Sequence, residues 1–246
     1  MAFGGSALDP LEWAKYVIRS RAEDDYPAAL TVLANRAGKG DAGAELYLGL
    51  VYARGQGITR DFRLAREWLQ RAVDQGNPDA AYFLGKIYVR GYGVPPDRKK
   101  AAELFDGPAR LGNPRAQYEL GLLYLDGTGV GRDLKRAAKW IGESAVRGNL
   151  EAEFIFGQLY RAGAGVERDN REAVRWLAIA GINGHRGAQL LLGNMYADGD
   201  GVNKDPAEAN RWYDLADGKK FTSVRRCGRH PAGPSAGPLV PARGPA

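Results

Sequence analysis

The strongest constraint on the fold is an internal repeat with a step of 36 residues. A Leu-Gly or Phe-Gly pair recurs without insertions, and its glycines are Gly49, Gly85, Gly121, Gly157 and Gly193. In register with each pair follow a tyrosine, a Gly-x-Gly turn, an aspartate and an alanine, which in the first copy are Tyr52, Gly55, Asp61 and Ala65. Self-similarity at a fixed period of this length indicates a repeat architecture in which each copy is one supersecondary unit.

Each copy predicts two α-helices. The first begins near Ala44 or its equivalents and runs to the Gly-x-Gly turn. The second places apolar side chains at Ala65, Trp68, Leu69 and Ala72, the i, i+3, i+4, i+7 spacing of one helical face. The aspartate before the second helix is a good N-cap. The glycines at its end predict left-handed C-terminal residues, and they are Gly76, Gly112, Gly148 and Gly184.

The glycine inside each first helix destabilises that helix, so another interaction must offset its cost. Glycine in a helix interior costs about 1 kcal/mol relative to alanine. We expect close approach of the second helix, with Ala65 and its equivalents facing the missing side chain.

The pattern A-x-x-x-L-G-x-x-Y-x-x-G-x-G-V-x-x-D-x-x-x-A-x-x-W resembles the Sel-one-like repeat family, relatives of the tetratricopeptide repeats. The resemblance implies an all-α fold, a right-handed α/α superhelical solenoid of 36-residue helix-turn-helix repeats. It also implies an interaction scaffold or adaptor, often in bacterial signalling, envelope or secretion pathways. The family is not generally catalytic.

The repeat divides the chain into three regions. Residues 44–220 hold five repeats (44–79, 80–115, 116–151, 152–187 and 188–220). Residues 1–43 resemble a degenerate N-terminal capping helix pair, in which Trp13 replaces the helix glycine. Residues 221–246 are rich in proline, glycine and alanine, and we predict a disordered basic tail.

The second repeat departs from the pattern, because Gly107-Pro108 falls inside its second helix. Proline there removes a backbone donor and predicts a kink or an early stop. Such a bend could reshape the superhelix. We favour the alternative, a tolerated irregularity on the outer surface.

Composition excludes several kinds of protein. The net charge of +6 equals the six basic residues after Gly218, so residues 1–217 are neutral and lack the basic footprint of a nucleic-acid-binding fold. One cysteine and two histidines argue against a disulfide framework and a metal site. No stretch reaches the ~18 apolar residues of a membrane span. The N-terminus lacks signal-peptide features, which predicts a cytoplasmic protein, or a periplasmic or secreted one if a signal peptide has been removed.

We find no catalytic constellation and no cofactor motif. The Gly-x-Gly turns lack the Lys-Ser/Thr of a phosphate-binding loop. His185 stands where other copies have asparagine, which predicts a helix cap rather than a catalytic base. Cys227 and His230 lie in the tail. The sequence therefore predicts a protein that is not an enzyme. A hydrolase, by analogy with cysteine-rich relatives, is a remote alternative.

A binding surface is easier to argue. One face of each first helix packs against the neighbouring helices. In this family's superhelix, the side chains on the opposite face of the first helices would line the concave wall. We predict that this groove binds a partner protein or peptide. Its candidate residues are Tyr47, Leu50, Arg54, Phe83, Lys86, Arg90, Glu119, Leu122, Asp126, Gln158, Arg161, Asn194 and Asp198. Basic residues dominate the early copies and acidic residues the late ones, which would orient a partner. The alternative is a structural subunit that associates through an uncovered C-terminal end at Trp212 and Tyr213.

Overall fold

The structure is a computed structural model that describes residues 9–219. This part of the chain contains α-helices, one 3-10 turn (η1) and no strand. The elements are α1 (Pro10–Ser20), η1 (Glu23–Asp25), α2 (Tyr26–Ala37), α3 (Ala42–Arg54), α4 (Phe62–Asp74), α5 (Pro78–Arg90), α6 (Arg98–Arg110), α7 (Pro114–Asp126), α8 (Leu134–Val146), α9 (Leu150–Ala162), α10 (Asn170–Ile182), α11 (Arg186–Asp198) and α12 (Pro206–Ala216). The predicted tail lies outside the described residues.

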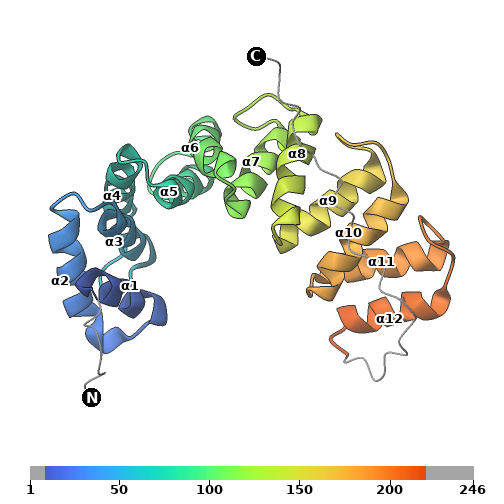
Figure 1. Ribbon diagram of the computed structural model, residues 1–246, viewed down its shortest axis with the longest axis horizontal. Helices are drawn as coiled ribbons and strands as arrows, with labels where there is room; N and C mark the ends of the chain where they lie inside the picture. Colours follow the sequence, from blue (N-terminus) through green and yellow to red (C-terminus); the bar gives the residue numbers. More distant parts are fainter. Residues whose placement is uncertain (1–8, 220–246) are drawn as a thin grey trace, which may run out of the picture. The chain divides into compact units, whose positions relative to one another are not determined.

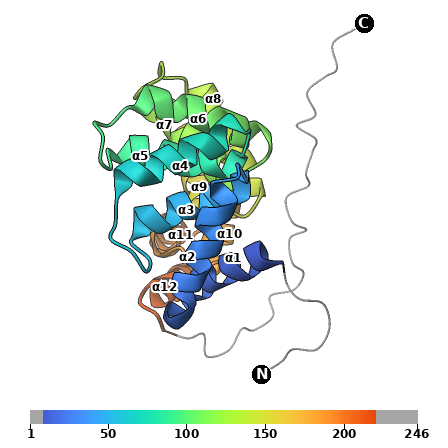
Figure 2. The same cartoon turned by 90° about the vertical axis from the view of Figure 1, so that its left-hand side faces the viewer.

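The chain forms two compact units, with their boundary inside α9 after Ala152. In the first unit each helix packs against the next from α1 to α8, and α2 lies beside both α1 and α3 (Figures 1 and 2). In the second unit α11 packs against both α10 and α12. The prediction of an all-α solenoid of helix-turn-helix repeats is confirmed.

Local capping chemistry sets the helix boundaries. Asp61 accepts hydrogen bonds from the backbone N–H groups of Arg63 and Leu64 at 2.8 and 3.0 Å. The equivalent aspartates cap the other second helices, and they are Asp97, Asp133, Asp169 and Asp205. The glycines that follow the second helices have positive φ, such as 80° at Gly76, as the sequence predicts.

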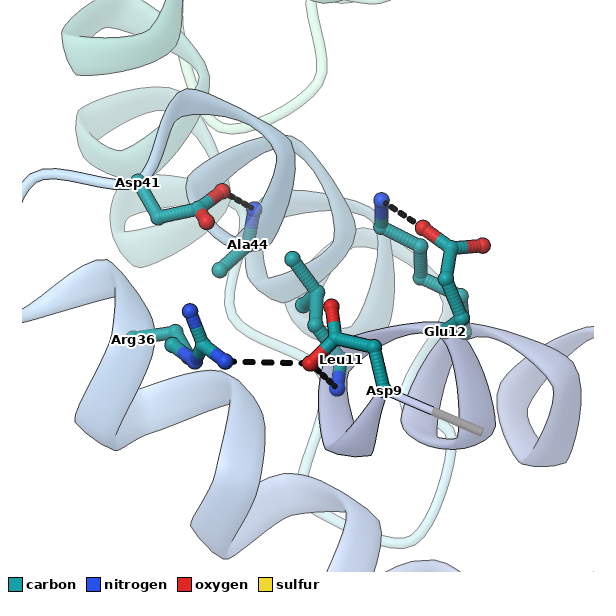
Figure 3. Close-up of polar contacts among 7 residues, drawn as sticks. Asp9, Leu11, Glu12, Arg36, Asp41 and Ala44 are labelled. Carbon is teal, nitrogen blue, oxygen red and sulfur yellow. Dashed lines mark hydrogen bonds and ion pairs between the residues drawn. The ribbon is translucent and has the colours of Figure 1, made fainter. Parts of the chain in front are cut away.

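The N-terminal helix pair is joined by a shared carboxylate. Asp9 caps α1 by accepting from the backbone N–H of Leu11, and the same oxygen accepts from Arg36 on α2 at 3.0 Å (Figure 3). Asp41 caps α3 in the same way, through the N–H of Ala44 at 2.9 Å. Arg21 ends α1 with a φ of 57°, at a position where the other copies have glycine.

The helix glycines are sites of close approach to the second helix, as the sequence predicts. A Cβ added to Gly49 would lie 2.7 Å from Cγ of Leu69, and 3.1 Å from the backbone oxygen of Ala65. Ala65 faces the missing side chain, as the sequence predicts, but through its backbone oxygen, and its own methyl group does not fill the space. The filling side chain is four residues further on, and its equivalents are Phe105, Ile141, Leu177 and Tyr213.

The second glycine of each Gly-x-Gly turn allows a different close contact, between neighbouring repeats. A Cβ on Gly93 would lie 2.8 Å from Cβ of Phe62, the first residue of α4. On Gly129 it would lie 2.3 Å from the carbonyl carbon of Arg98, the first residue of α6. The turn of one repeat thus packs on the start of the preceding repeat's second helix, and only glycine leaves room for this contact.

The proline in the second repeat does not shorten its helix. The helix α6 continues through Pro108 to Arg110 and has 13 residues, as α4 and α8 do. The expectation of an early stop is wrong. Pro108 is also buried rather than on the outer surface, because its ring lies on the packed face of α6.

A buried polar side chain recurs near the start of most first helices. Gln117 donates to the backbone oxygen of Ala109 at 3.0 Å, and Gln189 donates to that of Gly181 at 2.8 Å. Glu45 occupies the same position and accepts from Gln75 at 2.6 Å. Burial raises the pKa of Glu45 above its ordinary value of 4.5, and the Gln75 hydrogen bond opposes only part of this shift.

Glu45→Gln is therefore expected to stabilise the protein near neutral pH by about 1 kcal/mol. Because folding raises the pKa of Glu45, the native state binds the proton more tightly than the unfolded chain. The penalty is absent below pH 4.5 and develops as pH rises through the raised pKa. Urea unfolding at several pH values should show a gain that disappears in acid. The exposed Glu103→Gln is the control, and an equal gain in both variants would contradict the explanation.

Candidate functional site

The predicted groove residues fall into three classes of exposure in the first unit. Arg54, Arg90 and Asp126 are exposed. Leu50 is buried, with 8% of its surface accessible. The rest are half-buried, and they are Tyr47, Phe83, Lys86, Glu119 and Leu122. Most of these positions therefore keep a surface that a partner can contact.

Four of these residues meet at one hollow of about 520 Å³ between α3, α4 and α5. They are Leu50, Arg54, Phe83 and Lys86. The hollow is also lined by Ala53, Arg60, Phe62, Leu69, Ile87 and Tyr92.

The floor and one wall of the hollow are apolar. Leu69 is fully buried and Ile87 is 4% exposed. Phe62 and Tyr92 stack with ring centroids 4.9 Å apart and an interplanar angle of 14°. Gly93, next to Tyr92 in the same turn, also lies against Phe62. Tyr92 remains 46% exposed, so its ring is available to a partner.

The rim of the hollow is cationic, and no carboxylate lines it. The guanidinium of Arg60 lies 5.3 Å from the centroid of the Phe62 ring. Lys86 forms an ion pair with Glu119 of α7. Arg54 and Arg60 form no ion pair with any residue in the range 9–219.

Sequence reasoning missed the residues that come from the turns. Arg60 precedes the capping aspartate, Phe62 begins α4, and Tyr92 stands between the two turn glycines. The one available signal was Tyr92, because the other copies place glutamine, threonine, alanine or aspartate between those glycines.

The remaining predicted positions are partly engaged within their own units. Tyr47 lies beneath Lys15 and Arg19 of α1, 5.6 and 5.5 Å from its ring centroid. In the second unit Arg161 pairs with Asp200 at 3.2 Å, and Asn194 accepts from the Tyr213 hydroxyl at 2.8 Å. The other two candidates there, Gln158 and Asp198, are exposed.

Of the two side chains expected at an uncovered C-terminal end, Trp212 is buried in the second unit and Tyr213 is half-buried. Trp212 is 8% exposed, and its ring limits the space at Gly181. The ring of Tyr213 fills the space at Gly193. Trp212 therefore does not offer the expected stacking surface, whereas association through this end at the half-buried Tyr213 stays a prediction.

His185 caps α11, as the sequence predicts. Its Nδ1 accepts from the backbone N–H of Ala188 at 3.0 Å, and its ring stacks on Phe154 with centroids 4.1 Å apart. In the described residues no group of three or more His, Cys, Asp or Glu side chains could hold a metal ion. None of the helices between residues 9 and 219 has the length and apolar character needed to cross a membrane. Cys227 and His230 lie outside the described residues.

Three solved bacterial proteins illustrate what this chain resembles. The chain is 35% identical to a protective antigen of uropathogenic Escherichia coli with an SLR fold, with a TM-score of 0.75. That match covers 77% of this chain but only 40% of the antigen chain. A Sel1 repeat protein from Oxalobacter formigenes is 26% identical over 85% of both chains, with a TM-score of 0.78. An immunity protein of Pseudomonas aeruginosa, 21% identical over 94% of this chain and 92% of its own, shares the fold with a TM-score of 0.51.

The comparison with curated proteins gives no match. The Sel1 repeat family matches more than half of the sequence, at residues 42–77, 78–106, 114–149, 150–185 and 187–216. The second match stops just before Gly107-Pro108, where the second repeat departs from the pattern. The chain belongs to the Sel1 repeat family.

Proposed function

We propose that this protein is a non-enzymatic interaction scaffold that binds a segment of a partner protein along the exposed positions of its first helices. Sel1 repeats generally mediate protein interactions and are generally non-catalytic. The observation that carries the proposal is the hollow between α3 and α5, where four side chains from the candidate positions line one surface. The solved relatives are bacterial, so the pathway we propose is a bacterial one.

The repeat supports this proposal through the way in which its surface varies. The position before the turn holds Arg54, Arg90 and Asp126 in the first unit, at the last residue of α3, α5 and α7. The backbone is the same in each copy, but the charge at this position changes. A scaffold that presents different side chains at one register can recognise a partner without changing its fold.

A charge exchange tests the proposal. The full chain is used as bait in a bacterial lysate, and a captured protein is identified and purified. We expect the variant Arg90→Glu with Asp126→Arg to bind that protein about tenfold more weakly, because both charges move while the net charge is unchanged. Titration calorimetry measures the dissociation constant. Lys86 is left intact, because its reversal would place a carboxylate against Glu119.

The matched control is Glu103→Lys with Lys135→Glu. This pair exchanges the same charges at exposed positions of α6 and α8, which are second helices. An equal affinity of both variants, or capture of no protein by the wild type, counts against the scaffold.

A further inference from the structure

We propose that the hollow between α3 and α5 binds an acidic segment of a partner protein in which Asp or Glu residues flank one bulky apolar side chain. The inference rests on the proposed function and specifies the chemistry of the partner. It uses the turn residues Arg60, Phe62 and Tyr92, which the first-helix positions do not include.

The positive charge at the rim of the hollow indicates an acidic partner. The rim holds three cations and no carboxylate. Of these three cations, Lys86 alone has an ion-pair partner within residues 9–219, and that partner is Glu119. Arg54 and Arg60 are exposed and leave two guanidinium groups available for bidentate hydrogen bonds to carboxylates. Arg90 repeats the Arg54 position on α5, so the cationic rim continues along the candidate groove.

The apolar floor of the hollow indicates that the partner inserts an apolar side chain. Leu50, Leu69 and Ile87 lie beneath the rim, and Phe62 and Tyr92 form an aromatic wall. A volume of about 520 Å³ accommodates one large side chain with its flanking backbone. An apolar anchor in such a place excludes water, and this strengthens the ion pairs at the rim.

The positions of the three cations around the floor indicate the order of residues in the partner segment. Arg54 ends α3, Arg60 lies just before α4 and Lys86 lies in α5, so the cations come from three different elements around one apolar floor. An extended peptide reaches them from both sides of a single anchored side chain. The segment is therefore expected to have an acidic, apolar, acidic order.

The test is selection from a phage library of random peptides of about 12 residues, with the full-length protein immobilised. We expect enriched peptides to carry Phe, Leu, Ile or Trp within three residues of at least two Asp or Glu. The best peptide, made synthetically with a fluorophore, should lose at least tenfold in affinity on Arg54→Glu with Arg60→Glu, measured by fluorescence polarisation. Its affinity should also fall when salt rises from about 0.05 to 0.3 M, because exposed ion pairs are screened.

The matched control is Arg132→Glu with Arg168→Glu. Both arginines are exposed at the repeat position of Arg60, and the change in net charge is the same. This variant should bind the peptide within twofold of the wild type. Enrichment of peptides without carboxylates, no enrichment, or an equal loss in both variants overturns the inference.

Failure here is distinguishable from failure of the scaffold. A captured partner whose affinity falls on exchange of Arg90 and Asp126, but not on reversal of Arg54 and Arg60, leaves the scaffold in place and refutes this site. Self-association that depends on Arg54 and Arg60, detected by analytical ultracentrifugation, also refutes it, because the occupant would then be a second copy of this chain.

Discussion

Gly121→Leu is expected to lower the free energy of unfolding by about 3 to 5 kcal/mol. A Cβ at this position would already lie 2.6 Å from Cγ1 of Ile141 and 3.3 Å from the backbone oxygen of Ala137. The leucine must push α8 away from α7, and the packed interior offers no void to accept it. Urea unfolding followed by far-ultraviolet circular dichroism measures the change.

Gly107→Ala is the control for this prediction. Gly107 also lies inside a helix, but a Cβ there would meet no atom within 4 Å. The gain in helix propensity is opposed by the crowding of a residue before proline, so this variant should stay within about 1 kcal/mol of the wild type. A Gly121→Leu protein as stable as the Gly107→Ala protein would show that the two helices do not need the close approach.

Sequence alone predicted the helices, their capping residues and the role of His185 as a helix cap, because residues close together in the chain determine all three. An aspartate whose side chain reaches two or three residues ahead, as Asp61 does, caps a helix through contacts that the order of residues specifies. The same holds for the left-handed glycines, whose conformation few other residues adopt. Repetition made the inference stronger, since five copies carry the same local signals.

The contacts between elements could not be predicted in the same way. The sequence indicated that the second helix approaches each helix glycine at Ala65 or its equivalent, but not that the side chain of Leu69 fills the space. Ala65 and Leu69 lie on the same face of α4, one turn apart, so which side chain fills the space depends on the position of α4 along its axis, which a pattern of apolar positions leaves open. The burial of Pro108, by contrast, follows from the repeat, because Pro108 stands 36 residues after Ala72, on the apolar face of the second helix.

The candidate site was predicted in part. Leu50, Arg54, Phe83 and Lys86 were placed on one surface from their helical register, and they line the hollow. Arg60, Phe62 and Tyr92 were missed because they lie in or next to turns, where no periodicity applies. Tyr92 lies beside Phe62 because the turn of the second repeat packs on the first repeat, through Gly93 and Phe62.

Contacts of this kind between repeats lead to the second large effect, at Gly129. Gly129→Ala is expected to destabilise the protein by about 3 kcal/mol or more, because a Cβ would lie 2.3 Å from the carbonyl carbon of Arg98 and 2.5 Å from the nitrogen of Lys99. These are backbone atoms at the start of α6, so no side-chain rotation relieves the clash. The same urea unfolding measures this change.

Gly148→Ala separates packing from backbone strain. Gly148 has a φ of 78°, close to the 81° of Gly129, but a Cβ there would meet nothing within 4 Å. The left-handed conformation costs each alanine about 1 to 2 kcal/mol, so the excess at Gly129 measures the contact between two repeats. In a solenoid this contact couples neighbouring repeats, so its loss should let fewer repeats unfold together. Because less surface is then exposed in one transition, the dependence of the unfolding free energy on urea should also fall. Equal destabilisation by the two variants would mean that the turn glycine serves only its own backbone, and that the turn's packing on the preceding repeat adds nothing to stability.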